Sequence, residues 1–145
     1  MIQGRNGSVR CFGYNPWGQC GVDPESDNSG RIKHEEVLEF NLVPVPHSVD
    51  IDTGLQHCIS LSIEGHIYTW GKGQNGQLGH GIVEASHIPR RVNIENKCTK
   101  ISAGFSHSAA ICEQGKIYIW GKGLSEQRFS DEEQGTVSRK CFFSD

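Results

Sequence analysis

The sequence has no long apolar run, no excess of positive charge and no secretory leader. No stretch of its 145 residues approaches the roughly 20 apolar residues of a membrane-spanning helix, so we expect no membrane span. The formal net charge of -3 gives no basic field for direct binding to nucleic acid. Without the apolar core of a signal peptide, we expect an intracellular protein of the cytoplasm or nucleus. A missing upstream targeting segment would instead place it in the mitochondrion.

The sequence also lacks the cysteine spacing of a zinc site. None of its six cysteines forms a C-x-x-C pair, and the histidines form no i, i+4 ligand pair with acidic support. We therefore expect no bound metal and no cofactor. Several cysteines lie in strand-like runs, where a free thiol behaves as a small apolar side chain. We interpret the cysteines as reduced thiols, because disulfides are rare inside cells. They are Cys11, Cys20, Cys58, Cys98, Cys112 and Cys141.

Glycine is abundant, with 18 residues, and it recurs at fixed spacings. The run Glu64–Gly73 returns fifty residues later as Gln114–Gly123, and a weaker copy, Asn6–Gly13, stands fifty-eight residues earlier. The same offsets relate further segments outside this core. They match Gly18–Gly21 with Gly76–Gly79, and Gly54–His57 with Gly104–His107. Agreement at two constant offsets indicates an internal repeat, which is typical of solenoids and propellers.

Each copy has the alternation of a β-strand. Ile67 and Thr69 face one way, while Tyr68 and Trp70 face the other. A second strand is predicted just before it, in His57–Ser62. These β-branched and aromatic runs are short and closely spaced. The pattern favours antiparallel strands joined by tight turns.

Turn signals separate these strands. Gly65 and Gly115 each follow a polar residue between two strand-like runs, as in a β-hairpin. Further strands are predicted through Cys98–Ser102 and near Val92–Ile94. About four short strands per repeat make one blade of a β-propeller. We predict an all-β protein built of about two to three antiparallel, four-stranded blades.

The repeat divides the chain into a partial β-propeller, residues 1–123, and a tail, residues 124–145. The repeat units are predicted at about 6–53, 54–103 and 104–123. The tail has no repeat pattern, and we expect it to be poorly ordered. Because a partial propeller leaves blade faces uncovered, we also expect marginal stability or poor solubility. The predicted framework positions of the repeat are Gly13, Gly18, Gly21, Gly54, His57, Gly65, Trp70, Gly71, Gly76, Gly79, Gly104, His107, Gly115, Trp120 and Gly121.

These residues resemble a known repeat family. The run Trp70-Gly71-x-Gly73-x-Asn75-Gly76-Gln77-Leu78-Gly79-His80-Gly81, followed by Pro89 and Ala103–Ser108, is similar to the regulator of chromosome condensation repeat. The resemblance covers about residues 6–123. Members of that family form seven-bladed propellers, so the resemblance implies a partial, truncated member. The run Asn15–Gly21 is faintly similar to a mitochondrial member of the family.

The family resemblance implies a regulator or scaffold that binds proteins, including a small GTPase. Two alternatives follow from other members. The full-length protein would be a guanine-nucleotide exchange factor for a small GTPase, or a substrate-recruiting module of a ubiquitin ligase. In either case we expect this chain to have no catalytic residues of its own.

The surrounding sequence does not support a catalytic or nucleotide-binding interpretation of the motifs in this chain. Gly71–Gly76 matches G-x-G-x-x-G, but that fingerprint needs a helix directly after it, and Gln77–Gly81 is a poor helix start. We interpret it as a loop between blades. His57 and His107 recur at one repeat position, so we interpret them as structural. No G-x-S-x-G nucleophile elbow is present.

Two features depart from the repeat. Trp17 occupies a loop position where the next copy has Asn75, and we predict it as a candidate interface residue because aromatic residues are enriched at binding hot spots. The polar stretch from Val22 to about Glu39 is longer than its counterpart. We predict a solvated insertion loop there.

Overall fold

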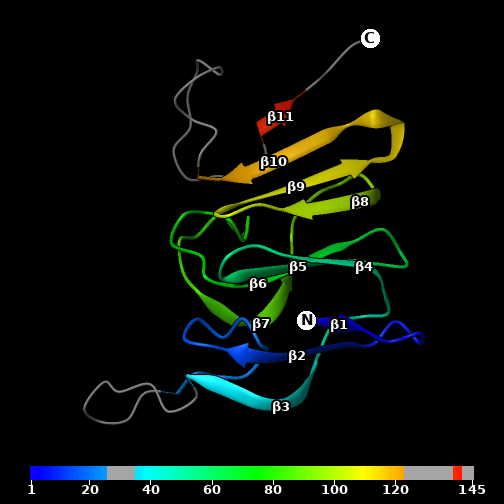
Figure 1. The fold of residues 1–145 in the computed structure, drawn as a ribbon. Helices are drawn as coiled ribbons and strands as arrows, with labels where there is room; N and C mark the ends of the chain where they lie inside the picture. Colours follow the sequence, from blue (N-terminus) through cyan, green and yellow to red (C-terminus); the bar gives the residue numbers. More distant parts are fainter. Residues whose placement is uncertain (26–34, 123–138, 142–145) are drawn as a thin grey trace.

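The computed structural model describes residues 1–25 and 35–122, together with the backbone of residues 139–141. It contains three antiparallel sheets, one beside the next (Figure 1). The first sheet has the order β1-β2-β3, the second β4-β5-β6-β7, and the third β11-β10-β9-β8. The prediction of an all-β protein built of incomplete propeller blades is therefore confirmed.

The strands have the following bounds. The first sheet comprises β1 (Ile2–Gln3), β2 (Val9–Tyr14) and β3 (Glu36–Val43), and the second comprises β4 (Ser48–Thr53), β5 (His57–Ser62), β6 (Ile67–Gly71) and β7 (Ser86–Arg91). The third comprises β8 (Cys98–Ala103), β9 (His107–Cys112), β10 (Ile117–Gly121) and β11 (Arg139–Cys141).

The second sheet shows how the repeat pattern becomes a blade. In β5 and β6, Ile59 lies opposite Thr69, and the turn between these strands has Gly65 at a φ of 84°. A positive φ of this size is easily adopted only by a residue without a Cβ atom. All residues of β5 are buried, because neighbouring sheets cover both of its faces. The period-2 pattern and the turn glycine were therefore sound signals for this hairpin.

The strand predicted near Val92–Ile94 was wrong. The strand in this part of the chain is β7, which ends at Arg91. Val92 and Ile94 lie just beyond it and are buried against the third sheet. Much of β7 is solvent-accessible and has little apolar patterning, so the buried residues after it gave the stronger signal.

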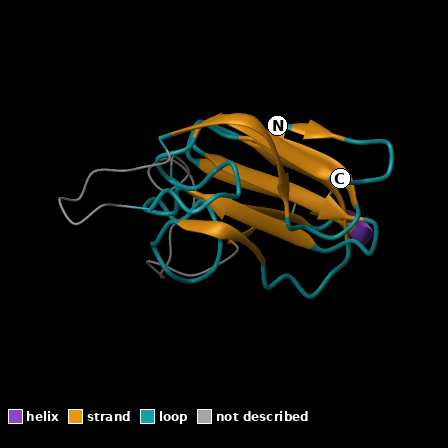
Figure 2. Ribbon diagram, turned by 90° about the horizontal axis from the view of Figure 1, so that it is seen from below, coloured by secondary structure: helices purple, strands orange, loops and turns teal. Residues whose placement is uncertain are grey.

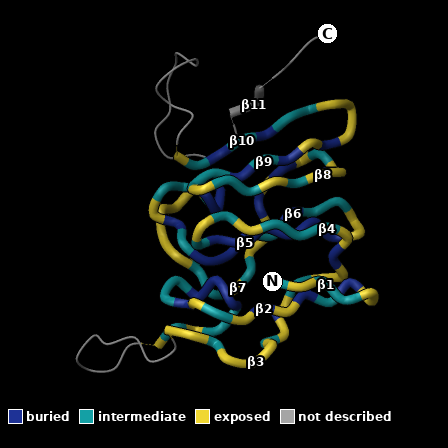
Figure 3. Tube along the Cα trace, viewed as in Figure 1, coloured by how far each residue is buried: buried dark blue, intermediate teal, exposed yellow. Residues whose placement is uncertain are grey.

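Two apolar cores lie between the sheets. The core between the first and second sheets contains Val9, Cys11, Cys20, Val43, Cys58 and Trp70. The core between the second and third contains Ile59, Leu61, Ile67, Val92, Ile94, Cys98, Ala110, Cys112, Tyr118 and Trp120. Each sheet thus buries a face only by stacking on its neighbour, as expected for a repeat protein. By contrast, β3 is largely exposed (Figure 3).

The ends of the predicted insertion and tail differ from expectation. The insertion loop was predicted to reach about Glu39, but β3 begins at Glu36, so its last residues form strand; residues 26–34 lie outside the described residues. In the tail, β11 pairs with β10 through Ile117–Ile119. An edge strand can be recruited by backbone hydrogen bonds without an apolar pattern. The rest of 124–145 lies outside the described residues.

The loops and turns that connect the strands lie at two opposite ends of the sheets. The loops after β2 and β6 and the β4–β5 and β8–β9 turns lie at one end, which we call the loop end (Figure 2). The β5–β6 turn and the 3-10 helix Glu113–Gly115 lie at the opposite end. The recurrent glycine-rich runs therefore converge on one surface of the molecule.

Candidate interaction site

Two tryptophans join neighbouring sheets by the same hydrogen bond. In β6, the indole Nε1 of Trp70 donates to the Gln19 carbonyl oxygen at 2.9 Å. In β10, Nε1 of Trp120 donates to the Gln77 carbonyl oxygen at 2.8 Å. Both indole rings are buried. The recurring tryptophan and the recurring Gly-Gln loop are thus two halves of one junction between sheets.

The glutamine side chains hold these loops in shape. The Trp17 backbone N–H donates to Oε1 of Gln19 at 3.0 Å, and the Asn75 N–H donates to Oε1 of Gln77 at 2.8 Å. Each glutamine therefore closes its own turn and presents its backbone carbonyl to the next sheet. In the part of the chain that the structure describes, no helix directly follows Gly71–Gly76. This run forms an inter-sheet loop.

The predicted framework glycines divide by backbone conformation. Gly71 shows why a side chain is excluded at the junction. A Cβ atom there would lie 2.6 Å from the Gln56 carbonyl oxygen, and its φ is 99°. Gly121 repeats this at the next junction, with Ser106 in the place of Gln56. Positive φ angles occur at Gly13, Gly18, Gly21, Gly65, Gly71, Gly76, Gly79, Gly115 and Gly121, but not at Gly54 and Gly104.

The imidazole of His57 lies in the second junction. Its Nε2 is 2.9 Å from Oγ of Ser108, and that hydroxyl donates to the Gln77 carbonyl at 2.9 Å. Because a serine hydroxyl has one hydrogen, Nε2 of His57 must be the donor in their bond. Burial, followed by the nearby His107, lowers the pKa of His57 to about 4. The ring is thus neutral near pH 7. His107, at the same repeat position in β9, is half-buried.

Two exposed apolar residues lie on adjacent turns at the loop end. The backbone N–H of Leu55 donates to the Phe105 carbonyl at 3.3 Å, which places the β4–β5 and β8–β9 turns side by side. The side chains are 56% and 70% exposed. The sequence reasoning missed them. The available signal was a large apolar residue directly after the recurring glycine in both copies, at a turn position where polar residues are usual.

Lysines accompany these apolar side chains. The Lys72 backbone N–H donates to the Gln56 carbonyl at 2.8 Å, and the Lys122 N–H donates to the Ser106 carbonyl at 2.9 Å. The backbone of each lysine therefore lies beside the residue that directly follows Leu55 or Phe105. The loop end therefore has two copies of one arrangement, an exposed apolar residue in a turn and a lysine in the loop whose backbone is hydrogen-bonded to that turn.

Trp17 lies at the same end of the molecule. Its ring is half-buried, and Nζ of Lys72 lies 4.9 Å from the ring centroid. The same Nζ bonds Oε1 of Gln56 at 3.0 Å. This cation–π contact fixes the lysine over the ring. The role of Trp17 in an interface stays a prediction. The residue lies at the loop end, as do Leu55 and Phe105.

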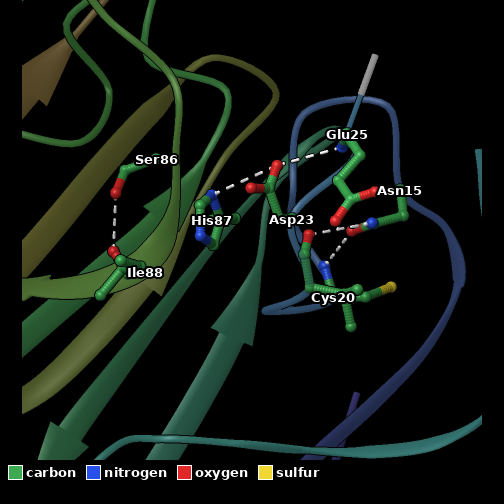
Figure 4. Close-up of polar contacts among 8 residues, drawn as sticks. Asn15, Cys20, Asp23, Glu25, Ser86, His87 and Ile88 are labelled. Atoms are coloured by element: carbon green, nitrogen blue, oxygen red, sulfur yellow. Dashed lines mark hydrogen bonds and ion pairs between the residues drawn. The ribbon is translucent and has the colours of Figure 1, made fainter. Parts of the chain in front are cut away.

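The loop after β2 lies against the second sheet (Figure 4). Oδ1 of Asp23 lies 3.9 Å from Nδ1 of His87 in β7. Within the loop, the Cys20 backbone N–H donates to Oδ1 of Asn15 at 2.8 Å, and the Glu25 N–H donates to Asp23 at 3.0 Å. The loop that carries Trp17 is therefore held by its own hydrogen bonds and contacts β7.

The expectation of reduced thiols is wrong for one pair of cysteines. Cys98 and Cys112 form a disulfide with an S–S distance of 2.02 Å. They lie opposite one another in the β8–β9 register, a neighbourhood that the 14-residue separation did not reveal. Cys11, Cys20 and Cys58 are free and buried, as expected.

The described residues include no helix long and apolar enough to cross a membrane. Within the same residues, no group of three or more histidine, cysteine, aspartate or glutamate side chains could hold a metal ion.

Comparisons with known proteins identify the repeat. Two family models, both described as the regulator of chromosome condensation (RCC1) repeat, match residues 64–111 in one case and residues 49–77 and 98–127 in the other. The human E3 ubiquitin-protein ligase HERC2 is 30% identical over 85 residues, covering 59% of this chain and 2% of the relative. The Arabidopsis thaliana ultraviolet-B receptor UVR8 is 39% identical over 69 residues, covering 43% and 16%.

Solved structures show the same fold at greater length. Human WBSCR16 superposes with a TM-score of 0.79 at 24% identity, covering 97% of this chain and 36% of that protein. Prp20p from Saccharomyces cerevisiae superposes with a TM-score of 0.74 at 24% identity, covering 95% and 35%. The chain thus spans about a third of these proteins and a smaller share of the curated relatives. It belongs to the regulator of chromosome condensation (RCC1) repeat family, and its three sheets are blades of that family's β-propeller.

Proposed function

We propose that this chain is a non-enzymatic protein-interaction module, a regulator or scaffold in a small-GTPase pathway, that binds its partner with the loop end. The observation that carries the proposal is the repeated arrangement of an exposed apolar residue in a turn with a lysine in the adjacent loop. Leu55 and Lys72 form one unit, and Phe105 and Lys122 form the next. We propose that the module acts inside the cell, in the cytoplasm or nucleus.

The physical argument rests on desolvation. Exposed leucine and phenylalanine side chains gain free energy when a partner covers them, at about 25 cal/mol per Å² of apolar surface. Flanking lysines favour a partner surface with carboxylates around an apolar centre, and they speed its approach. Because the turns are fixed by backbone hydrogen bonds, little ordering entropy is lost on binding.

Relatives support a protein partner. The Prp20p study concerns binding to Gsp1p and to histones, and HERC2 is a ubiquitin-protein ligase. For a longer chain that contains these blades, the two alternatives are nucleotide exchange on a small GTPase and substrate recruitment to a ubiquitin ligase.

The test uses a panel of purified small GTPases loaded with mant-GDP, a fluorescent GDP. We expect saturable binding to at least one of them, with an unchanged rate of mant-GDP release. Replacing both apolar residues, Leu55→Asp with Phe105→Asp, should weaken binding at least about tenfold, as for hot-spot residues. The control is Ile63→Asp, which changes a 65% exposed residue at the opposite end.

Each result has a distinct meaning. Saturable acceleration of mant-GDP release would establish exchange activity and contradict the pure scaffold. Failure to bind any GTPase would contradict the link to that pathway. Equal weakening by the Ile63→Asp control would contradict the assignment of the loop end.

A further inference from the structure

Three free cysteines meet at the junction between the first and second sheets. The sulfur atoms of Cys11 in β2 and Cys20 in the following loop are 3.4 Å apart. The sulfur of Cys58 in β5 lies 3.3 Å from the Gln19 carbonyl, which also accepts the indole hydrogen bond of Trp70. All three thiols are buried, with exposed fractions of 5%, 1% and 3%.

The second junction shows that the fold does not require these thiols. At the offsets of the repeat, Cys11, Cys20 and Cys58 correspond to Thr69, Leu78 and Ser108. Thr69 Oγ1 donates to the Leu78 carbonyl, and Ser108 Oγ donates to the Gln77 carbonyl. The second junction therefore has two hydroxyl groups and an aliphatic side chain at the three positions where the first junction has thiols.

We propose that Cys11 and Cys20 are a redox-active pair that hydrogen peroxide converts to a disulfide. A sulfur–sulfur separation of 3.4 Å needs to shorten by about 1.4 Å to reach a covalent bond. Both residues belong to one β-strand and the loop that follows it, so the closure involves local motion. Cys58 positions the pair without entering the bond.

The chemistry balances with peroxide as the only oxidant. The Cys11 thiolate attacks one peroxide oxygen, the O–O bond breaks, and hydroxide leaves, so that Cys11 becomes a sulfenic acid. The Cys20 thiol then attacks the Cys11 sulfur and gives up its proton to the hydroxide of the first step, so that the S–S bond forms and a second hydroxide leaves. The two thiol protons convert both hydroxides to water. Two electrons pass from the thiols to the peroxide.

The surroundings favour Cys11 as the attacking sulfur. The neighbouring Cys20 thiol, and after it the Cys58 thiol, lowers the pKa of Cys11, because an S–H group beside Cys11 can turn toward its sulfur and stabilise the thiolate once the proton has left. The same interactions, together with burial, raise the pKa of Cys20 and of Cys58.

Disulfide formation would act on the junction directly. Gln19, whose carbonyl receives the Trp70 indole, is the neighbour of Cys20 in sequence. Drawing Cys20 toward β2 moves this carbonyl, and the environment of Trp70 changes with it. The same loop carries Trp17, so oxidation would also alter the surface at the loop end.

Peptide mapping tests the proposal without ambiguity. Trypsin cleavage after Arg10 and Arg31 leaves Cys11 and Cys20 in one peptide, whereas Cys58 lies in another, residues 34–72. The folded chain is treated with peroxide and then alkylated with iodoacetamide in denaturant. We expect peptide 11–31 to lose two hydrogens and take up no alkyl group. This should occur before Met1, the single methionine, is oxidised.

Variants copied from the second junction supply matched controls. Cys20→Leu, the residue of position 78, should stop at a Cys11 sulfenic acid that dimedone traps. Cys58→Ser, the residue of position 108, should keep the disulfide but form it several-fold more slowly. Circular dichroism checks that each variant folds, and the oxidised wild type should show shifted tryptophan emission.

Several outcomes would overturn the proposal. Two alkyl groups on peptide 11–31 after peroxide treatment would show an unreactive pair. A cross-link between peptides 11–31 and 34–72 would identify Cys58 as a bonding partner. Disulfide formation only in denaturant would mean that the folded geometry does not promote it. Zinc retained by the purified chain and lost in Cys58→Ser would identify a metal site instead.

Discussion

Nε2 of His57 donates a hydrogen bond to Oγ of Ser108, on the neighbouring sheet, across 2.9 Å. The Ser108 hydroxyl in turn donates a hydrogen bond to the Gln77 carbonyl, which also accepts a hydrogen bond from the Trp120 indole. The Gln77 carbonyl thus accepts two hydrogen bonds from the third sheet. Through Ser108, this network also includes His57 of the second sheet. Among the described residues, Nδ1 of His57 has no hydrogen-bond partner. The buried network favours the neutral imidazole, because burial disfavours the charged form of the ring.

Acid should destabilise the folded chain through His57. Its pKa is about 4 when folded and about 6.5 when unfolded, so the unfolded state binds the proton first as the pH falls. The contribution is fully present above about pH 6.5 and is lost progressively toward pH 4, by about 3 kcal/mol in total. Urea unfolding of wild type and His57→Gln at pH 7 and pH 4.5 measures it. An identical loss of stability in both proteins would contradict this assignment.

Removing the Trp70 indole donor should destabilise the first junction. In Trp70→Phe, the ring still fills part of the core, but the Gln19 carbonyl loses its 2.9 Å hydrogen bond. We expect a loss of about 1–3 kcal/mol in the free energy of unfolding, typical of a buried polar group left with fewer partners. Trp17→Phe is the control, because the turn bond of Trp17 is made by its backbone N–H. Equal losses in the two variants would argue against a special role for the junction.

Two glycines with positive φ should differ in their tolerance of alanine. At Gly71, a Cβ atom would lie 2.6 Å from the Gln56 carbonyl oxygen, whereas at Gly76 nothing lies within 4 Å. Gly76→Ala carries only the strain of a positive φ, about 1 kcal/mol. Gly71→Ala adds overpacking, a further cost of about 1–3 kcal/mol. Thermal unfolding of both variants checks the order, and a more damaging change at Gly76 would refute the argument from contact.

The outer face of the first sheet should promote self-association. Leu38 is 85% exposed, and Phe12 and Phe40 stack edge to face at 4.6 Å with about half of each ring accessible. Phe12 occupies the repeat position of Trp70 and Trp120, which are buried by the preceding sheet. We expect concentration-dependent association and hydrophobic-dye binding, both reduced by Leu38→Lys with Phe40→Lys. A concentration-independent thermal transition with little dye binding in the wild type would contradict this expectation.

Local pattern predicted the hairpins but not their neighbours. The alternation in Ile67–Trp70 and the glycine at position 65 report on a strand and a turn, which depend on adjacent residues only. β11 and the start of β3 at Glu36 depend instead on edges offered by distant strands. Val92 was assigned to a strand because burial and strand structure give the same apolar signal.

The sequence by itself determined the repeat, the β class and the identity of the recurring positions, because a constant offset between copies can be read without three-dimensional information. Only the tertiary structure decided what those positions do. It joined Trp70 to Gln19 across 51 residues, paired Cys98 with Cys112, and brought three thiols into one junction. It also placed Leu55 beside Phe105 at the loop end. These contacts come from stacking one sheet on the next, which no local pattern specifies.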